Sequence, residues 1–133
     1  MAFSIGLVAN NDVRGGEIVK FNKDFTSIHA RFSQAGKFIV QTPGIYAFHI
    51  NSLSESNRQV WLDVFKNKYY LASLHAYTPN DYADAGNTII LDLKQHDQVF
   101  LRSVHANTLF GKGDEIYNTF SGELLFPNHA GKY

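Results

Sequence analysis

The sequence predicts an all-β protein in which two sheets pack face to face around one hydrophobic core. Three observations predict it: short apolar or alternating runs recur along the 133 residues, turn-forming residues separate them, and no segment has the period of an amphipathic helix. An aromatic content of 14% indicates a rigid, phenylalanine-rich core. A single domain is expected over residues 1–133, since this length suits one core.

Ten strands are expected where β-branched and aromatic residues gather. In chain order they cover residues 2–9, 18–21, 26–30, 38–41, 45–53, 59–66, 69–74, 88–93, 98–105 and 119–126. Turn residues lie between them, at 10–12, 15–16, 35–36, 43–44, 66–68, 79–81, 95–97 and 111–113. About ten short strands at this spacing fit a jelly roll.

The segment 36–50, GKFIVQTPGIYAFHI, is the most informative part of the chain. Its apolar residues alternate on both sides of Pro43-Gly44, which predicts a β-hairpin that leads into a long central strand.

Side chains alternate along that strand, so Tyr46, Phe48 and Ile50 point to one face and the residues between them to the other. Neither face is polar, although an antiparallel sheet normally leaves one face to water. We therefore expect the second face, with Ile45, Ala47 and His49, to be covered by another copy of the protein.

The same segment, with GKF followed by five residues and G-x-Y-x-F, resembles the signature hairpin of the complement C1q globular-head family, which is related to the tumour necrosis factor fold. Four more stretches resemble this family in the same order along the chain. They are AFSIGLV from residue 2, VKFNK from 19, HDQVFLR from 96 and YNTFSGELLF from 117.

The resemblance implies a ten-stranded jelly-roll β-sandwich of the C1q/tumour necrosis factor type that assembles as a homotrimer. It agrees with the alternation in placing Tyr46, Phe48 and Phe120 in the core, and Ile45, Ala47 and His49 at the trimer interface. It also implies a secreted, extracellular protein, whose signal peptide would have been removed, because MAFSIGLVANND is predicted to be a first strand.

Composition excludes several classes of partner and chemistry. The 12 basic and 12 acidic side chains are spread evenly, so nothing favours nucleic acid or an anionic membrane surface. No stretch approaches the roughly 20 apolar residues of a membrane span. The absence of cysteine excludes disulfides and thiolate metal sites.

Catalytic and metal motifs are also missing. The six histidines are too widely spaced to predict a zinc site; they are His29, His49, His75, His96, His105 and His129. Gly111-Lys112-Gly113 lacks the remainder of a phosphate-binding loop, and no G-x-S-x-G elbow occurs. We therefore predict that the protein is not an enzyme, and no cofactor is expected apart from the calcium alternative below.

The acidic and aromatic loop 75–86, HAYTPNDYADAG, is the predicted ligand-binding site. An aromatic ring beside a carboxylate suits the apolar face and the hydroxyls of a sugar. The binding residues predicted there are His75, Tyr77, Asp81, Tyr82 and Asp84. Asp81 and Asp84 could also bind calcium, as several trimers of the resembled family do in this region, but a solvated loop with ordinary carboxylates is favoured over a calcium site.

Two pairs of large apolar residues are candidates for a contact surface. Trp61 and Phe65 lie on the face of their strand opposite Val60, Leu62 and Val64, so they are expected outside the core or in a subunit contact. Leu109 and Phe110 are expected at the tip of a long loop.

The leading functional prediction is a soluble extracellular pattern-recognition protein of innate immunity. It would be lectin-like and would bind microbial surface glycans or lipopolysaccharide through a multivalent trimer. The first alternative is a ligand of a cell-surface receptor or a matrix component, with a cytokine-like or structural role. The second is a glycan-active enzyme, which would require two carboxylates facing a cleft.

Overall fold

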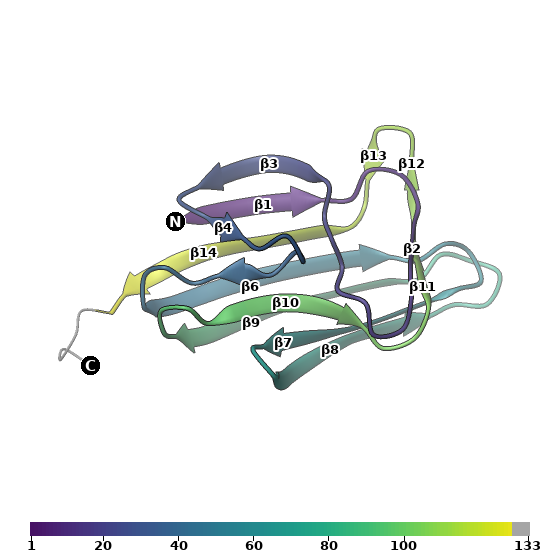
Figure 1. The fold of residues 1–133 in the computed structure, drawn as a ribbon. Coiled ribbons are helices and arrows are strands. Elements are labelled where there is room, and N and C mark those ends of the chain that lie inside the picture. Colours follow the sequence, from purple (N-terminus) through teal and green to yellow (C-terminus); the bar gives the residue numbers. More distant parts are fainter. Residues whose placement is uncertain (129–133) are drawn as a thin grey trace.

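The computed structural model describes residues 1–128 and consists of two packed antiparallel sheets (Figure 1). Sheet I has the order β3-β1-β14-β6-β9, and sheet II the order β4-β5-β10-β7-β8. The strands of sheet I are β1 (Ala2–Gly6), β3 (Lys23–Ile28), β6 (Gly44–Leu53), β9 (Asp84–Leu93) and β14 (Thr119–Pro127). The strands of sheet II are β4 (Arg31–Phe32), β5 (Phe38–Ile39), β7 (Gln59–Lys66), β8 (Tyr69–Tyr77) and β10 (Gln98–Ser103).

Four shorter strands close one end of the sandwich. β2 (Asn11–Val13) pairs with β11 (Asn107–Leu109), and β12 (Gly111–Lys112) pairs with β13 (Glu115–Ile116). The ten strands of the two sheets confirm the predicted all-β sandwich. In the described part of the chain, no helix is long and apolar enough to cross a membrane.

The segment 36–50 is not the hairpin that its alternation predicted. β5 lies in sheet II and β6 in sheet I, so Pro43-Gly44 forms a corner at which the chain crosses between sheets. A side chain at Gly44 would overlap the backbone oxygen of Phe126, which explains the glycine. Alternation cannot distinguish a hairpin within one sheet from a corner between two sheets, because in both arrangements each strand has one face toward the core.

Residues 18–21 were predicted to be a strand, and this was wrong. Ile18 forms only an isolated bridge with Arg102, and Val19 donates one backbone hydrogen bond of 2.9 Å to the oxygen of Leu101. Residues 10–12 were predicted to be a turn, yet Asn11 and Asp12 belong to β2. In these short segments the pattern of apolar and polar residues indicates which side chains are buried, and it does not indicate whether the backbone forms a strand.

Phenylalanine rings fill the core between the sheets. Phe3 lies 5.0 Å from Phe38 and 5.2 Å from Phe120 between ring centroids, and Phe48 stacks on Phe120 at 5.9 Å. Tyr46, Phe48 and Phe120 are each at most 1% exposed. The Tyr46 hydroxyl donates to the backbone oxygen of Thr42, and burial raises the pKa of Tyr46 above its ordinary value.

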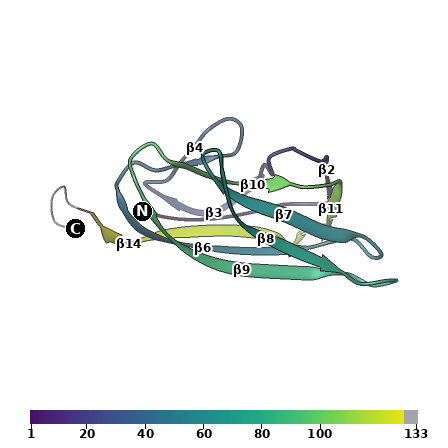
Figure 2. The same ribbon diagram turned by 90° about the horizontal axis from the view of Figure 1, so that it is seen from below.

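Loops from both sheets gather at one end of the sandwich. Figures 1 and 2 show the β6–β7 and β8–β9 connections at the end that also carries β2, β11, β12 and β13. The N-terminus and the C-terminal end of β14 lie at the other end (Figure 1). We call the end with these loops the loop end; it comprises residues 54–58, 78–83 and 104–117.

Candidate functional site

Buried polar side chains hold the loop end together. The Ser54 hydroxyl, which is fully buried, donates to the backbone oxygen of Arg58 at 2.9 Å and accepts from the Ala83 amide at 3.2 Å. Ser54 thereby ties loop 54–58 to loop 78–83. No sequence signal marks this role, since a buried serine cannot be distinguished from a surface serine in a single sequence.

Two buried asparagines extend this framework. Asn118 accepts from the Leu53 amide and donates to the Phe110 oxygen, both at 2.9 Å. Asn107 accepts from the Trp61 amide at 2.6 Å and donates back to the Trp61 oxygen at 3.0 Å. Each side chain bonds to backbone groups of a segment distant in the chain, so the loops rest on a rigid base.

The predicted binding loop is shorter in the structure than in the sequence analysis. His75 and Tyr77 belong to the end of β8, and Asp84 begins β9 opposite Leu53. Only residues 78–83 connect the two strands. The predicted loop therefore includes the last residues of β8 and the first residues of β9.

The five predicted site residues divide among separate surroundings. His75 lies on the outer face of sheet II, where its ring centroid is 4.5 Å from that of Trp61. Asp81 accepts a hydrogen bond from the Tyr82 amide at 2.8 Å, which stabilises its own turn. Asp84 is exposed at the strand start. The structure therefore does not bring the five residues into one contiguous cluster.

Tyr77 borders a shallow pocket of about 280 Å³ at the loop end. Its hydroxyl donates to Asn57 Oδ1 at 3.3 Å, and the Asn80 amide donates to the same oxygen at 3.3 Å. Arg58, Gln59 and Thr108 also line the pocket. An exposed tyrosine ring beside guanidinium, amide and hydroxyl groups can stack on a sugar and hydrogen-bond its hydroxyls.

Tyr82 joins an aromatic cluster formed from three loop-end segments. Its ring centroid is 4.8 Å from that of Phe110, which in turn is 5.5 Å from Tyr117. The Tyr117 hydroxyl donates to the Glu115 carboxylate, and this hydrogen bond raises the pKa of Tyr117. Leu109, which precedes Phe110, is buried in the core. Of the pair predicted at a loop tip, only Phe110 is therefore accessible.

The acidic side chains of this loop do not fit a calcium site within one chain. Calcium takes about six to eight oxygen ligands, whereas this loop supplies only two carboxylates, Asp81 and Asp84. Residues 1–128 hold no group of three or more His, Asp or Glu side chains arranged to bind a metal ion. His129 lies outside the described residues.

The second face of sheet I points away from the core and carries one mostly apolar row of side chains. This row contains Ile28, Ala2, Glu123, Ala47 and Ile90 in register. Ile28 is 53% exposed and Ile90 is 63% exposed, whereas Ala47 between them is 4% exposed.

The neighbouring row of this second face is polar. It carries His49, whose Nδ1 is 3.1 Å from Thr88 Oγ1 and whose Nε2 is 3.4 Å from Glu123 Oε1. Ile45 lies beyond Ala47 on the same side, paired with Phe126. Ile45, Ala47 and His49 thus share one surface, with the composition of a subunit contact: apolar groups beside satisfied polar ones.

Aromatic residues also cover the outer face of sheet II. Phe65 stacks on Phe100 with ring centroids 5.5 Å apart, and the Arg102 guanidinium lies 5.2 Å from the Phe65 centroid. Trp61 packs between His75 and His105. Val60, Leu62 and Val64 on the same strand are fully buried, so Trp61 and Phe65 lie outside the core, as expected.

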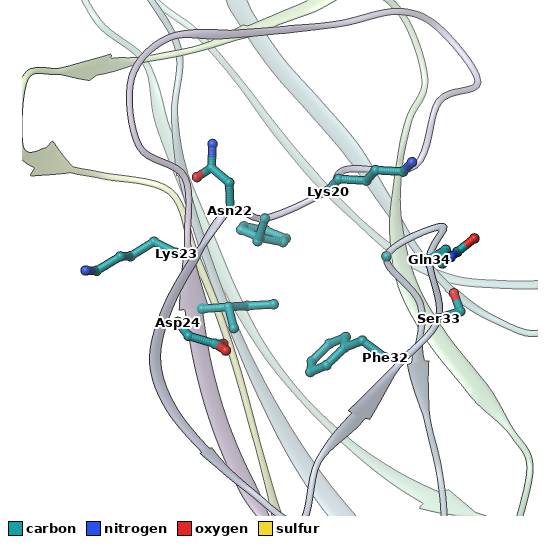
Figure 3. A pocket seen from close by; sticks show the side chains of 10 residues that line it. Lys20, Asn22, Lys23, Asp24, Phe32, Ser33 and Gln34 are labelled. Atoms are coloured by element: carbon teal, nitrogen blue, oxygen red, sulfur yellow. The ribbon is translucent and has the colours of Figure 1, made fainter.

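A further pocket, of about 490 Å³, lies at the edge of the sandwich between β3 and β4 (Figure 3). Ile5, Phe21 and Phe32 supply apolar lining, and polar side chains form the remainder. The polar lining residues are Lys20, Asn22, Lys23, Asp24, Ser33 and Gln34. Sequence analysis missed this site, because its residues come from three segments that only the fold brings together.

Comparison with known proteins agrees with this architecture. The C1q domain family matches residues 2–125. Complement C1q tumor necrosis factor-related protein 1 of Mus musculus is 28% identical over 133 residues, covering 95% of this chain and 47% of the relative. The chain spans about half the length of the curated relatives that it matches.

Solved structures show the same fold. The globular domain of zebrafish complement 1qA protein has a TM-score of 0.73 at 22% identity, covering 96% of this chain and 98% of that one. Eiger TNF from S. frugiperda has a TM-score of 0.77 at 10% identity, covering 100% and 97%. The fold is therefore the jelly roll of the C1q and tumour necrosis factor class. Within this class the chain belongs to the C1q domain family, which confirms the predicted resemblance.

Proposed function

We propose that this protein is a secreted pattern-recognition protein of innate immunity, which binds microbial surface glycans or lipopolysaccharide as a homotrimer. The observation that carries the proposal is the loop end, where exposed Tyr77 borders a polar pocket beside the cluster of Tyr82, Phe110 and Tyr117. Aromatic rings beside hydrogen-bonding groups on a rigid β scaffold suit carbohydrate. Domains of this family are typically non-enzymatic ligands, so we propose no catalytic role.

The trimer would form through the second face of sheet I. Ile45, Ala47 and His49 would then lie near a threefold axis, and exposed Ile28 and Ile90 of the same row would become buried. Burying such residues contributes about 1.5–3 kcal/mol for each aliphatic side chain. Three identical loop ends on one rigid trimer would gain about 10² to 10⁴ in avidity on a repetitive microbial surface.

Alanine replacement of Tyr77 and Tyr82 tests the glycan proposal. We expect Tyr77→Ala and Tyr82→Ala together to weaken binding to a bacterial glycan array at least tenfold, or about 1.4 kcal/mol. The trimer should remain intact in light scattering, because neither residue lies on the second face of sheet I. Tyr69→Ala is the matched control, since Tyr69 is 68% exposed at the opposite end of β8. Array binding that is equal in all three proteins would refute the proposed site.

The alternative role, as a ligand of a cell-surface receptor or matrix component, is favoured by a different surface. Tyr69 and Tyr70 are 68% and 56% exposed side by side at the β7–β8 turn. Exposed tyrosines are enriched in protein interfaces. Loss of cell binding on Tyr69→Ala with Tyr70→Ala, together with absence of any glycan signal for the wild type, would support this alternative.

A further inference from the structure

The edge pocket between β3 and β4 has a structural origin that explains its shape. β3 is the outermost strand of sheet I and β4 is the outermost strand of sheet II. The chain joins these two edges through His29 and Ala30, so they converge at one end and diverge toward Lys23 and Ser33. The sandwich is therefore open at this edge, and the pocket of about 490 Å³ lies within the usual range for small-molecule sites.

A β-bulge aims one carboxylate into this opening. In the β1–β3 ladder Ser4 pairs with Thr26, but the next residue of β1, Ile5, pairs with Asp24, leaving Phe25 as the extra residue. Directly paired residues share a face of the sheet, so Asp24 points to the same side as Ile5, which lines the pocket. Bulges commonly re-aim a side chain near a binding site.

Aromatic and aliphatic side chains form the apolar wall. Phe32 is held by an edge-on contact with Phe3 at 4.9 Å, and Phe21 by a contact with Phe120 at 5.8 Å. Both rings are partly exposed, so each combines a core-anchored side with a side facing the pocket. In Figure 3 the Phe32 ring and the Asp24 carboxylate extend toward each other across the pocket.

Hydrogen bonds fix the two rims before any ligand arrives. Asn22 Oδ1 accepts from the Val8 backbone amide at 2.7 Å, and the backbone N–H of Asn22 donates to the backbone oxygen of Gly6 at 3.0 Å. On the opposite rim the Gly36 amide donates to the Ser33 oxygen at 3.0 Å, with Gly36 in the left-handed region at φ 92°. A rim that is already ordered loses little conformational entropy on binding.

The charges select the kind of ligand. Among the described residues, the Asp24 carboxylate makes no side-chain hydrogen bond or ion pair, and it faces the pocket centre, where it would repel an anion. Lys20 and Lys23 extend outward from the rim in Figure 3, so they do not neutralise the Asp24 carboxylate at the pocket centre. Their positive charges repel a cation that approaches the rim. A neutral ligand with hydroxyl donors and an apolar face satisfies both conditions.

We propose that this pocket binds one neutral sugar ring, with its C–H face against Phe21 and Phe32 and two of its hydroxyls donating to Asp24. The inference rests on the proposed recognition of glycans and adds a second sugar site that is separate from the loop end. The edge pocket would bind a single sugar ring, and the loop end would bind a larger part of the glycan.

Amide chemical shifts of the ¹⁵N-labelled trimer test this proposal directly. The probes are the methyl glycosides of glucose, galactose, mannose and N-acetylglucosamine, titrated into the millimolar range. We expect at least one of them to move the amides of residues 20–24 and 32–36 in a saturable manner. Asp24→Asn should weaken that titration about tenfold, because a hydroxyl bonds more strongly to a carboxylate than to an amide.

Controls separate this site from the loop end and from the general effect of charge. Asp114→Asn removes an exposed carboxylate at the β12–β13 turn and should leave the titration unchanged. Tyr77→Ala with Tyr82→Ala should also leave it unchanged. Sugar-induced shifts confined to residues 75–86 would overturn the edge site while the proposed function stood. Tighter binding of methyl glucuronide than of methyl glucoside, lost on Lys20→Ala, would overturn the neutral ligand.

Discussion

Replacing Asn118 with alanine should loosen the loop end and lower the stability of the whole domain. Asn118 is fully buried and bridges β6 to the β11–β12 connection through hydrogen bonds to the Leu53 amide and the Phe110 oxygen. Alanine removes both bonds and leaves two part-buried backbone groups without these partners. Each orphaned group costs about 1–3 kcal/mol, so we expect a loss of about 2–6 kcal/mol.

Urea unfolding at a fixed protein concentration measures this loss, since the stability of an oligomer depends on concentration. We expect the midpoint to fall while the slope stays constant. Asn87→Ala, at an exposed position on β9, is the matched control and should change the free energy of unfolding by less than about 0.5 kcal/mol. Equal midpoints for the Asn118 and Asn87 variants would refute the reasoning that the buried amide carries this end of the fold.

Three further predictions concern the second face, the core and alkaline pH. Ala47→Glu places a carboxylate directly opposite Glu123, and it should convert the proposed trimer to monomer in light scattering; an unchanged trimer would contradict the assembly. Gly122→Ala inserts a methyl group into the Phe3 ring and should cost about 1–3 kcal/mol in urea unfolding. Burial raises the pKa of Tyr46, so its contribution to stability is complete below about pH 10, the ordinary value, and is lost as pH rises through the raised pKa. Tyr46→Phe should therefore show a shallower loss of stability above pH 10 than wild type, and parallel curves would argue against this linkage.

Sequence reasoning succeeded where a local pattern has one structural solution. The strand 59–66 was predicted with the bounds of β7, and the strand 45–53 within one residue of β6. Both are long, and their alternation matches one buried and one outer face. Tyr46 and Phe48 follow from the same period, because neighbouring side chains on a strand point to opposite sides.

It failed where two tertiary arrangements share one local pattern. A hairpin and a crossover between sheets give the same alternation around Pro43-Gly44, so only the pairing of β5 with β10 distinguishes them. Residues 18–21 resemble a strand in sequence because Val19 is buried in the core, although in the described chain this segment pairs only through the isolated bridge of Ile18 with Arg102.

The candidate sites show the same division. The sequence analysis predicted Tyr77 and Tyr82 as binding residues from their residue types; in the structure Tyr77 borders a pocket with Arg58, whereas Tyr82 packs on Phe110. The two tyrosines have different surroundings because their contacts come from loops that are distant in the chain. The buried role of Asn118 carries no local signal, since its partners are more than sixty residues away in one case and eight in the other.

The sequence alone determined the fold class, the family and the core positions Tyr46, Phe48 and Phe120, because alternation and five ordered motifs can be recognised without coordinates. The tertiary structure alone decided the edge pocket, in which Asp24, Phe21 and Phe32 meet across two sheets. A bulge of one residue in the β1–β3 ladder turns Asp24 inward. Such a shift in register depends on the pairing of two strands, and no single strand encodes it.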